Sequence, residues 1–432
     1  MRITSIIGYI TLLFIAWLIS SNRKNINWRV ITWGAVIQII FAGFLFLFPA
    51  GAKLFMFINR IVLAVLDSAT AGTKFVFGRL ALGPGTIGNA GETSLGYFLA
   101  FQALPTIVFF AALVALLYYF GIMNKIIQFF SYIFTKLMRI SGAESCSAAS
   151  NIFVGVESAL VVKPYVGKMT RSELNTILTC GMATIASSMM AVYIFILKEQ
   201  FPTIAGHLVS ASIMNVPAAI IISKLLVPED GIPKTLGMNI KPYYKKESNM
   251  FEAIINGANS GIRLLVGIVA LLLAFLGIVE LLDKIIGLFG VNINNVFNIN
   301  VDWSLKGLLG YLFYPFTVII GIPLSDAGHI ARIIGERSVL TEVTAFQDLA
   351  ILINSGVPLS PRSIVITTYA LTGFAHVASI AIFVGGISAI VPERMKDLTK
   401  LGFKALIGAT LANLLTASVA GIFYSNSSIL IN

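Results

Sequence analysis

The amino-acid sequence predicts an all-α polytopic membrane protein with eight transmembrane helices, two re-entrant hairpins, an interfacial amphipathic helix and an inverted repeat. The composition, the spacing of long apolar segments and a pattern shared by the two halves of the chain all support this fold class. Of the 432 residues, 57% are hydrophobic and only 11% are charged, against about 25% charged in soluble proteins. So few charged residues cannot cover a soluble protein of this length, whereas lipid can replace water around much of it.

The charges and the metal-binding residue types exclude several other classes of protein. The net charge of +11 favours Lys and Arg gathered in cytoplasmic loops over a nucleic-acid surface. The two cysteines, Cys146 and Cys180, lie in apolar surroundings and provide no disulfide framework. The three histidines, His207, His329 and His376, are scattered singly and form no zinc motif. A cytosolic enzyme, a nucleic-acid binder and a secreted disulfide scaffold are therefore poor interpretations.

Eight segments have about 20 apolar residues with charges only at their ends, as a membrane span requires. They lie near residues 4–21, 29–48, 95–121, 173–196, 205–227, 258–282, 363–390 and 402–426. The first has no small-x-small cleavage site before Asn22 and a second follows at once, so it is interpreted as a span and not as a signal peptide. Residues 50–80 and 122–140 alternate apolar with charged residues at helical spacing, which predicts amphipathic helices near the interface.

The positive charges of the loops predict the orientation of the chain, because Lys and Arg collect on the cytoplasmic side of a membrane. Five clusters can all lie on that side if eight spans leave both termini outside. The clusters are Arg23, Lys24 and Arg29; Lys125, Lys136 and Arg139; Lys163, Lys168 and Arg171; Lys234, Lys241, Lys245 and Lys246; and Arg394, Lys396, Lys400 and Lys404. This topology requires that residues 141–170 and 305–360 do not cross. Both stretches are interrupted by Gly and Pro, which favours re-entrant hairpins.

The two halves of the chain share a pattern that predicts an internal repeat. Each has a hairpin-like stretch with an isolated carboxylate, Glu157 or Glu342, followed by a span that contains G-x-A-x-x-A-S, at 181–187 and at 373–379. Secondary transporters often contain inverted repeats whose broken helices meet near the midplane and bind substrate and ion there. The Gly- and Ser-rich centres would let backbone groups leave the helix and face a ligand.

Carboxylates and oxygen-bearing side chains in these stretches are candidate ligands. An ionised side chain at membrane depth costs about 2.5–3.5 kcal/mol, so Glu157 and Glu342 indicate function unless each is paired structurally. A carboxylate accepts hydrogen bonds from a polar ligand without supplying a donor. Asn151 and Thr184 have oxygens suited to a hard cation, although either alone is equally typical of helix packing. No G-x-S-x-G, H-E-x-x-H or P-loop motif occurs, so enzyme chemistry has no support.

Around these residues the sequence resembles the concentrative nucleoside transporter family over essentially the whole chain. In the first half the resemblance rests on G-A-E-S at 142–145, S-N-I-F-V-G at 150–155 with Glu157, K-P-Y at 163–165 and M-T-R-S-E-L at 169–174. In the second half, G-E-R at 335–337 and T-E-V at 341–343 are similar to the family's G-x-K…N-E-F hairpin. The stretch G-F-A-H at 373–376 with S-I at 379–380 is similar to its G-F-A-N-x-x-S-I signature.

The resemblance implies a homotrimer in the inner (plasma) membrane, in which a scaffold holds a mobile transport domain. The scaffold would comprise residues 1–121, with spans one to three and the interfacial helix at about 50–80, and the sixth span at 258–283. The transport domain would comprise residues 122–227 and 305–432, each with one hairpin and two spans. Residues 228–257 would form a basic cytoplasmic loop between the halves.

The resemblance also implies which residues bind the substrate and the coupling ion. The implied substrate-binding residues are Gly155, Val156 and Glu157 on the first hairpin, which meet the base, and Glu342, Phe374, His376 and Ser379, which hold the ribose side. The implied sodium ligands are the Asn151 side chain, the Thr184 hydroxyl, and the backbone carbonyls of Val154 and Ile185.

Three positions depart from the family pattern. The usual G-Q-x-E-x-P is here G-V-E-S-A at 155–159, which aligns best with one residue deleted, so that Val156 replaces the glutamine that reads the base edge. His376 replaces the usual asparagine and can change its charge near neutral pH. Thr341 stands where asparagine is common. We therefore expect base selectivity to differ from that of the family.

The predicted function is cation-coupled nucleoside import by elevator-like alternating access, with Na⁺ as the coupling ion and no other cofactor. A proton-coupled symporter is the alternative, with Glu157, Glu342 or His376 titrating. From a different class, a non-transporting nucleoside-binding or gate-type membrane protein stays open, and gradient-driven uptake separates it from both. A membrane enzyme is the weakest interpretation, because no nucleophile–base constellation occurs. The expected partners are a nucleoside, the lipid bilayer and further copies of the chain, and not nucleic acid.

Overall fold

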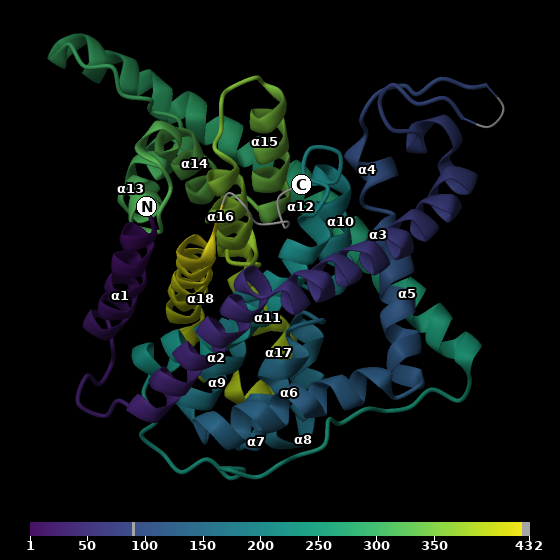
Figure 1. Ribbon diagram of the computed structural model, residues 1–432, viewed down its shortest axis with the longest axis vertical. Helices are drawn as coiled ribbons and strands as arrows, with labels where there is room; N and C mark the ends of the chain where they lie inside the picture. Colours follow the sequence, from purple (N-terminus) through teal and green to yellow (C-terminus); the bar gives the residue numbers. More distant parts are fainter. Residues whose placement is uncertain (89–90, 426–432) are drawn as a thin grey trace.

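The computed structural model describes residues 1–88 and 91–425, which form helices of very different lengths joined by loops (Figure 1). Seven helical segments within these ranges are long and apolar enough to cross a membrane. They are Trp28–Leu47, Pro49–Ala81, Leu99–Tyr119, Arg171–Leu197, Ile204–Leu226, Met250–Phe297 and Pro392–Phe423. Shorter apolar helices occupy Arg2–Leu18, Leu305–Ile319 and Val377–Ile390. The predicted all-α membrane fold class is confirmed.

The N-terminal part contains α1 (Arg2–Leu18), α2 (Trp28–Leu47), α3 (Pro49–Phe77), the short η1 (Gly78–Ala81) and α4 (Leu99–Gln102), and α5 (Thr106–Tyr119). Helix α3 fills the stretch predicted to be amphipathic and runs obliquely across the molecule in Figure 1. Its first residue is Pro49, a position where the missing N–H needs no partner. The span predicted at 95–121 corresponds to the apolar segment Leu99–Tyr119, in which the single turn α4 and Pro105 precede α5.

The first half continues with α6 (Ile122–Met138), α7 (Gly142–Ser150), η2 (Val156–Val162), α8 (Lys163–Val166), α9 (Arg171–Ala183), α10 (Ser187–Leu197) and α11 (Ile204–Leu226). The Thr170 side chain and Glu173 form a reciprocal capping box that starts α9. The span predicted at 173–196 is two helices, because the backbone of Thr184 and Ala186 is extended and interrupts the helical hydrogen bonds between α9 and α10.

Helix α12 (Met250–Phe297) has 48 residues, whereas the sequence predicted a span of 258–282. At 1.5 Å per residue it is about 72 Å long, more than twice the thickness of a hydrocarbon core. Residues 250–257, which were predicted as the end of a loop at 228–257, are therefore part of helix α12. It packs closely on α5 through two glycines: a Cβ on Gly257 would lie 2.7 Å from Ala112 Cα, and one on Gly261 would lie 2.7 Å from Val108 Cα. Small residues allow such close approach in membranes.

The second half contains α13 (Leu305–Ile319), α14 (Leu324–Arg337), α15 (Glu342–Asn354), α16 (Pro361–Leu371), α17 (Val377–Ile390), η3 (Pro392–Arg394) and α18 (Met395–Phe423). The stretch 305–360, predicted as one hairpin, is three helices. Gly321, with φ of +102°, turns the chain between α13 and α14, and residues 338–341 link α14 to α15. The span predicted at 363–390 is interrupted at 372–376, and α18 begins at Met395 and not at 402.

The two halves run through the same series of elements. A single helix (α6 or α13) precedes a hairpin (α7 with η2 and α8, or α14 with α15), then an interrupted helix (α9–α10 or α16–α17) and a long helix (α11 or α18). Both G-x-A-x-x-A-S motifs lie over the interruptions, at 184–186 and 372–376. The repeat pattern thus corresponds to a real structural repeat.

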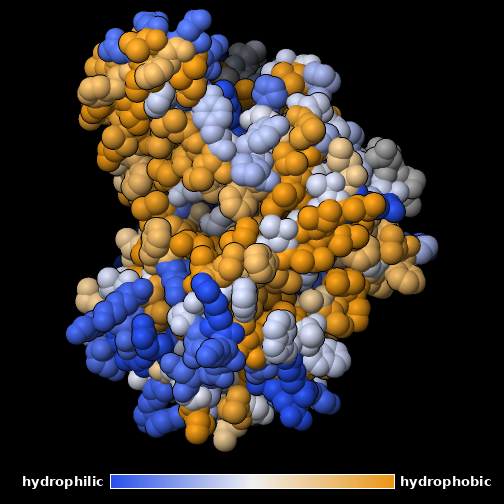
Figure 2. Space-filling model, turned by 90° about the vertical axis from the view of Figure 1, so that its left-hand side faces the viewer, coloured by the Kyte–Doolittle hydropathy of each residue, from blue (hydrophilic) through white to orange (hydrophobic). Residues whose placement is uncertain are grey.

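The core lies around α9, α11 and α18, whose residues are mostly buried. By contrast, only 6% of the most apolar 18-residue stretch of α12 is buried. Figure 2 shows apolar side chains over the middle of one face, with hydrophilic residues gathered mainly at its lower end. An apolar belt with a polar end is the surface that a bilayer requires.

Candidate functional site

The interruption between α9 and α10 (residues 184–186) lies in contact with the one between α16 and α17 (residues 372–376). The Phe374 N–H donates to the Thr184 carbonyl at 3.4 Å. The side chain of Asn413 on α18 donates to the carbonyls of both Ala183 and Thr372, each at 2.7 Å. The last carbonyls of a helix have no partner within it, so one buried amide satisfies both broken ends. The geometry therefore fixes the interruption of each half against that of the other.

Glu342 lies at this meeting point, at the N-terminus of α15, where the helix dipole favours a negative charge. Its side chain is buried. One carboxylate oxygen accepts a hydrogen bond from the hydroxyl of Tyr193, which stacks on Phe346 at a centroid distance of 4.6 Å. The other oxygen lies 3.4 Å from Nε2 of His376, whose ring is 4.5 Å from that of Phe374. Tyr193 and His376 thus face the two oxygens of one buried carboxylate, and Phe346 and Phe374 pack against their rings.

Ser379 lies one helical turn beyond His376. Its hydroxyl donates to the His376 carbonyl at 2.6 Å, so the hydroxyl oxygen keeps its capacity to accept. Of the seven predicted substrate-binding residues, the structure therefore brings four together: Glu342, Phe374, His376 and Ser379.

The three predicted residues of the first hairpin are arranged differently. Val156 packs against α17, where a Cβ on Gly386 would lie 2.5 Å from Val156 Cγ2. A Cβ on Gly155 would lie 3.6 Å from both Ala186 Cβ and Glu157 Oε2. Glu157 itself is exposed, whereas Glu342 is buried. Glu157 is the second residue of η2, at the bend of the hairpin, where exposure avoids the desolvation cost of a buried charge.

The predicted sodium ligands lie along the hairpin bend and the first interruption. Asn151 Nδ2 donates to the Ser147 carbonyl at 3.0 Å, and its buried Oδ1 has no hydrogen-bond partner in the described part of the chain. The Thr184 hydroxyl donates to the Cys180 carbonyl at 2.8 Å and keeps its lone pairs free. A buried oxygen without a partner and a second one with spare lone pairs fit a hard cation.

Hydrogen bonds tie these two segments together. The Phe153 carbonyl, between Asn151 and Val154, accepts from both the N–H and the hydroxyl of Ser187, each at 2.8 Å. Ser187 begins α10, two residues after Ile185. The carbonyl-bearing positions Val154 and Ile185 are thereby held on adjoining segments.

Sequence reasoning missed three side chains that complete the site: Tyr193, Arg337 and Asn413. Arg337 is fully buried at the end of α14 and donates to Ala370 O and Asn413 Oδ1, both at 2.9 Å. Its Nε and Nη2 have no hydrogen-bond partner within residues 1–88 and 91–425. Arg337 inside a hairpin and Asn413 inside an apolar span could have been found from the sequence. Polar and charged residues are costly in membrane segments, so their presence there indicates a function.

Comparisons with known proteins show which family the chain resembles. The family described as the C-terminus of Na⁺-dependent nucleoside transporters matches residues 207–421, and its N-terminal counterpart matches residues 7–80. A family described as "Gate: Nucleoside recognition" matches residues 100–200. The chain is 33% identical to the nucleoside permease NupC of Helicobacter pylori, covering 97% of each. It is 36% identical to an uncharacterized transporter of Haemophilus influenzae, covering 98% of this chain and 97% of that protein.

It is also 35% identical to solute carrier family 28 member 3 of mouse, covering 96% of this chain and 58% of the longer mouse protein. Among solved structures, CNTnw in an inward-facing substrate-bound state matches with a TM-score of 0.87 and 34% identity, over 98% of this chain and 97% of that one. A CNTnw variant in an outward-facing state matches equally well, with a TM-score of 0.87 and 33% identity over the same shares. Sequence and fold agree along nearly the entire chain, which belongs to the concentrative nucleoside transporter family.

Proposed function

We propose that this chain is a sodium-coupled nucleoside importer that works by elevator-like alternating access. The observation that carries the proposal is the buried Glu342 carboxylate beside the two helix interruptions. A carboxylate there accepts hydrogen bonds from the hydroxyls of a ribose, and the neighbouring Phe374 ring gives an apolar surface for the sugar or base. Glu157, Gly155 and Val156 would approach the base from the first hairpin, and Ser379 would complete the ribose side.

Sodium would bind through Asn151 Oδ1, the Thr184 hydroxyl and the carbonyls of Val154 and Ile185. The unpaired, buried Asn151 oxygen supports this assignment, as does the match to a family described as Na⁺-dependent. Because these ligands come from both the first hairpin and the first interruption, a bound cation would fix the two segments together. Substrate that contacts the same segments would then bind better with the ion present, which is the coupling that symport requires.

Proton coupling is the second candidate, and the contact between His376 and Glu342 favours it. A histidine 3.4 Å from a buried carboxylate is a pair that can take up a proton between its members. A gate-type protein that binds nucleosides without transporting them is the third candidate, favoured by the match of residues 100–200 to a nucleoside-recognition family.

The assembly we propose is a homotrimer in the cell inner membrane, with both termini outside the cytoplasm. The five basic clusters support this orientation. The largely uncovered apolar surface of α12 supports contact with lipid or with other copies of the chain. Residues 1–121 and 258–283 would form the fixed scaffold, and residues 122–227 and 305–432 would move against it.

Uptake of a radiolabelled nucleoside into proteoliposomes tests the function. Sodium and proton gradients are imposed separately, with ionophore-treated vesicles as the control. We expect the sodium gradient alone to drive accumulation. Accumulation with the proton gradient alone would establish the second candidate. Binding without accumulation under either gradient would establish the third.

A further inference from the structure

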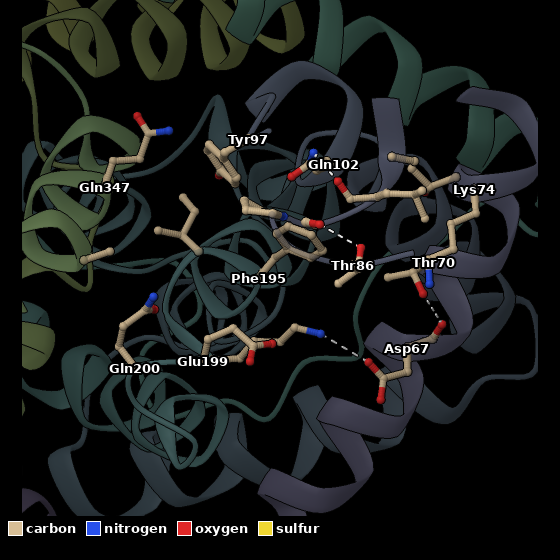
Figure 3. Close-up of a pocket in the computed structure, with 18 of the residues that line it drawn as sticks. Asp67, Thr70, Lys74, Thr86, Tyr97, Gln102, Phe195, Glu199, Gln200 and Gln347 are labelled. Carbon is tan, nitrogen blue, oxygen red and sulfur yellow. Dashed lines mark hydrogen bonds and ion pairs between the residues drawn. The ribbon is translucent and has the colours of Figure 1, made fainter. Parts of the chain in front are cut away.

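A cleft of about 760 Å³ opens away from the site described above, within the ~300–1,000 Å³ range of small-molecule sites. Its walls come from α3, from the segment that follows α3 up to α4, from the end of α10 and from α15 (Figure 3). None of the proposed substrate or sodium ligands lines it. In the proposed division, α3 and the segment after it belong to the scaffold, whereas α10 and α15 belong to the transport domain. The cleft therefore lies between the two units.

The charged side chains of the cleft favour a ligand without net charge. Two acids, Asp67 and Glu199, and two bases, Lys74 and Lys198, line it, and these formal charges cancel. Lys198 Nζ lies 3.4 Å from Asp67 Oδ1, so one acid and one base already neutralise each other across the two units. The cleft therefore has no net charge that would attract a strongly anionic or cationic ligand.

Aromatic rings and amides supply the other contacts. The rings of Phe195 and Tyr97 lie toward the middle of the cleft in Figure 3, with amide side chains around them. The Oε1 atoms of Gln102 and Gln200 are buried and have no hydrogen-bond partner in the described part of the chain. Gln102 is held in place by its Nε2, which donates to the carbonyls of Leu82 and Gly96 at 2.8 Å each.

An unpaired buried acceptor costs about 1–3 kcal/mol. Both oxygens are closed to solvent, so a ligand that donates N–H or O–H groups would remove that cost only after these amides turn toward the cleft. The ligand that fits is therefore neutral, has a flat ring for the aromatic side chains and carries several N–H or O–H donors. A nucleoside has all three properties, and it is the molecule that the proposed function supplies to this membrane.

We propose that the cleft is a second nucleoside-binding site, distinct from the one at Glu342. The proposal rests on the proposed function for its choice of ligand. The cleft elements α4 and α15 lie at the end of the molecule opposite α6 and α8, which carry basic residues (Figure 1). The charge rule assigns the end with the cleft to the outside, so an incoming nucleoside would meet it first. Because both units form its walls, an occupied cleft also stabilises this relative position of the units. High nucleoside concentrations should consequently slow transport.

The test measures how many radiolabelled uridine molecules bind each full-length chain at saturation in detergent. We expect two for the wild type and one for Glu342→Gln. We also expect one for the cleft variant Phe195→Ala with Gln200→Leu, and none for the combination of all three changes. The matched control Gln128→Leu, on the amphipathic helix α6 at the opposite end of the molecule (Figure 1), should keep two.

Each outcome distinguishes the two proposals. One uridine in the wild type that is lost only in Glu342→Gln overturns the second site and leaves the proposed function intact. One uridine that is lost only in the cleft variant supports the cleft and overturns the role of Glu342. No binding to the wild type overturns both. As an independent readout, uptake by the wild type should fall at high uridine concentration, and uptake by the cleft variant should not; identical profiles would overturn the second site.

Discussion

Nε2 of His376 lies 3.4 Å from Oε2 of Glu342, and both side chains are buried. Glu342 begins α15 and His376 immediately precedes α17, so the contact joins the second hairpin to the second interruption. The Tyr193 hydroxyl already occupies the other carboxylate oxygen. In the proposed function, a nucleoside bound at Glu342 would therefore have His376 as a neighbour.

Glu342→Gln should strongly weaken nucleoside binding at the Glu342 site while the protein stays folded. The amide keeps the size of the side chain but loses a charge-assisted acceptor, typically worth about 1.5–3 kcal/mol. Equilibrium binding should therefore weaken by about ten- to 150-fold, since 1.4 kcal/mol is a factor of ten. Size-exclusion chromatography checks that the assembly is retained. Unchanged affinity would remove Glu342 from the substrate site.

Asn151→Ala combined with Thr184→Ala should remove the stimulation of uptake by sodium. Two of the four proposed oxygen ligands disappear, and backbone carbonyls alone leave a hard cation under-coordinated. The measurement is initial uptake rate against sodium concentration in proteoliposomes. If uptake by the wild type does not depend on sodium but responds to a proton gradient, the coupling ion is a proton and not sodium.

The substrate site should tolerate different bases. Val156 packs against Gly386 and has no side-chain hydrogen-bonding group, so the first hairpin should read the base mainly through Glu157 and shape. Apolar pockets discriminate by only about 1–3 kcal/mol. We expect uridine, cytidine and purine nucleosides to compete for uptake within about 1–2 kcal/mol of one another.

A competition panel measures this tolerance directly. A preference beyond about a hundredfold for one base would show that a polar group, with His376 the nearest candidate, reads the base. Failure of every nucleoside to compete would exclude nucleosides as the substrate class.

Lys224→Met should strongly destabilise the protein. Lys224 on α11 lies 2.8 Å from Glu144 of the first hairpin, and both side chains are buried. Removing one partner of a buried ion pair costs about 3–5 kcal/mol, because a charge stays buried without its counterion. Thermal unfolding in detergent measures the loss. The double variant Glu144→Gln with Lys224→Met should recover most of it, and a double variant no more stable than the single would contradict this explanation.

Asn413→Leu should also destabilise the protein, because the Ala183 and Thr372 carbonyls lose their donor and Arg337 loses an acceptor. Each buried group left without a partner costs about 1–3 kcal/mol. Asn292→Leu is the matched control, since its amide is exposed and donates only to a carbonyl of its own helix; it should change stability by about 0.5 kcal/mol or less. Equal melting temperatures for the two variants would show that Asn413 does not hold the interruptions together.

The sequence alone determined the membrane class, the repeat and the family. The membrane class follows from composition, because a chain with only 11% charged residues cannot cover a large water-exposed surface with them. The repeat was readable because the two G-x-A-x-x-A-S motifs keep their order relative to Glu157 and Glu342. The Gly and Ser residues of these motifs also indicated where backbone groups could leave the helix, although the sequence predicted each span as a single segment.

Only the tertiary structure decided how long each helix runs, which polar side chains meet and how far each carboxylate is buried. The 48 residues of α12 form one helix that packs on α5 through Gly257 and Gly261, a contact that no local pattern shows. Glu157 is exposed and Glu342 is buried although both carboxylates occur in similar patterns. Their surroundings come from segments far away in the chain, Tyr193 and His376 for Glu342, and burial is a property of those long-range contacts, which the order of residues along one helix does not specify.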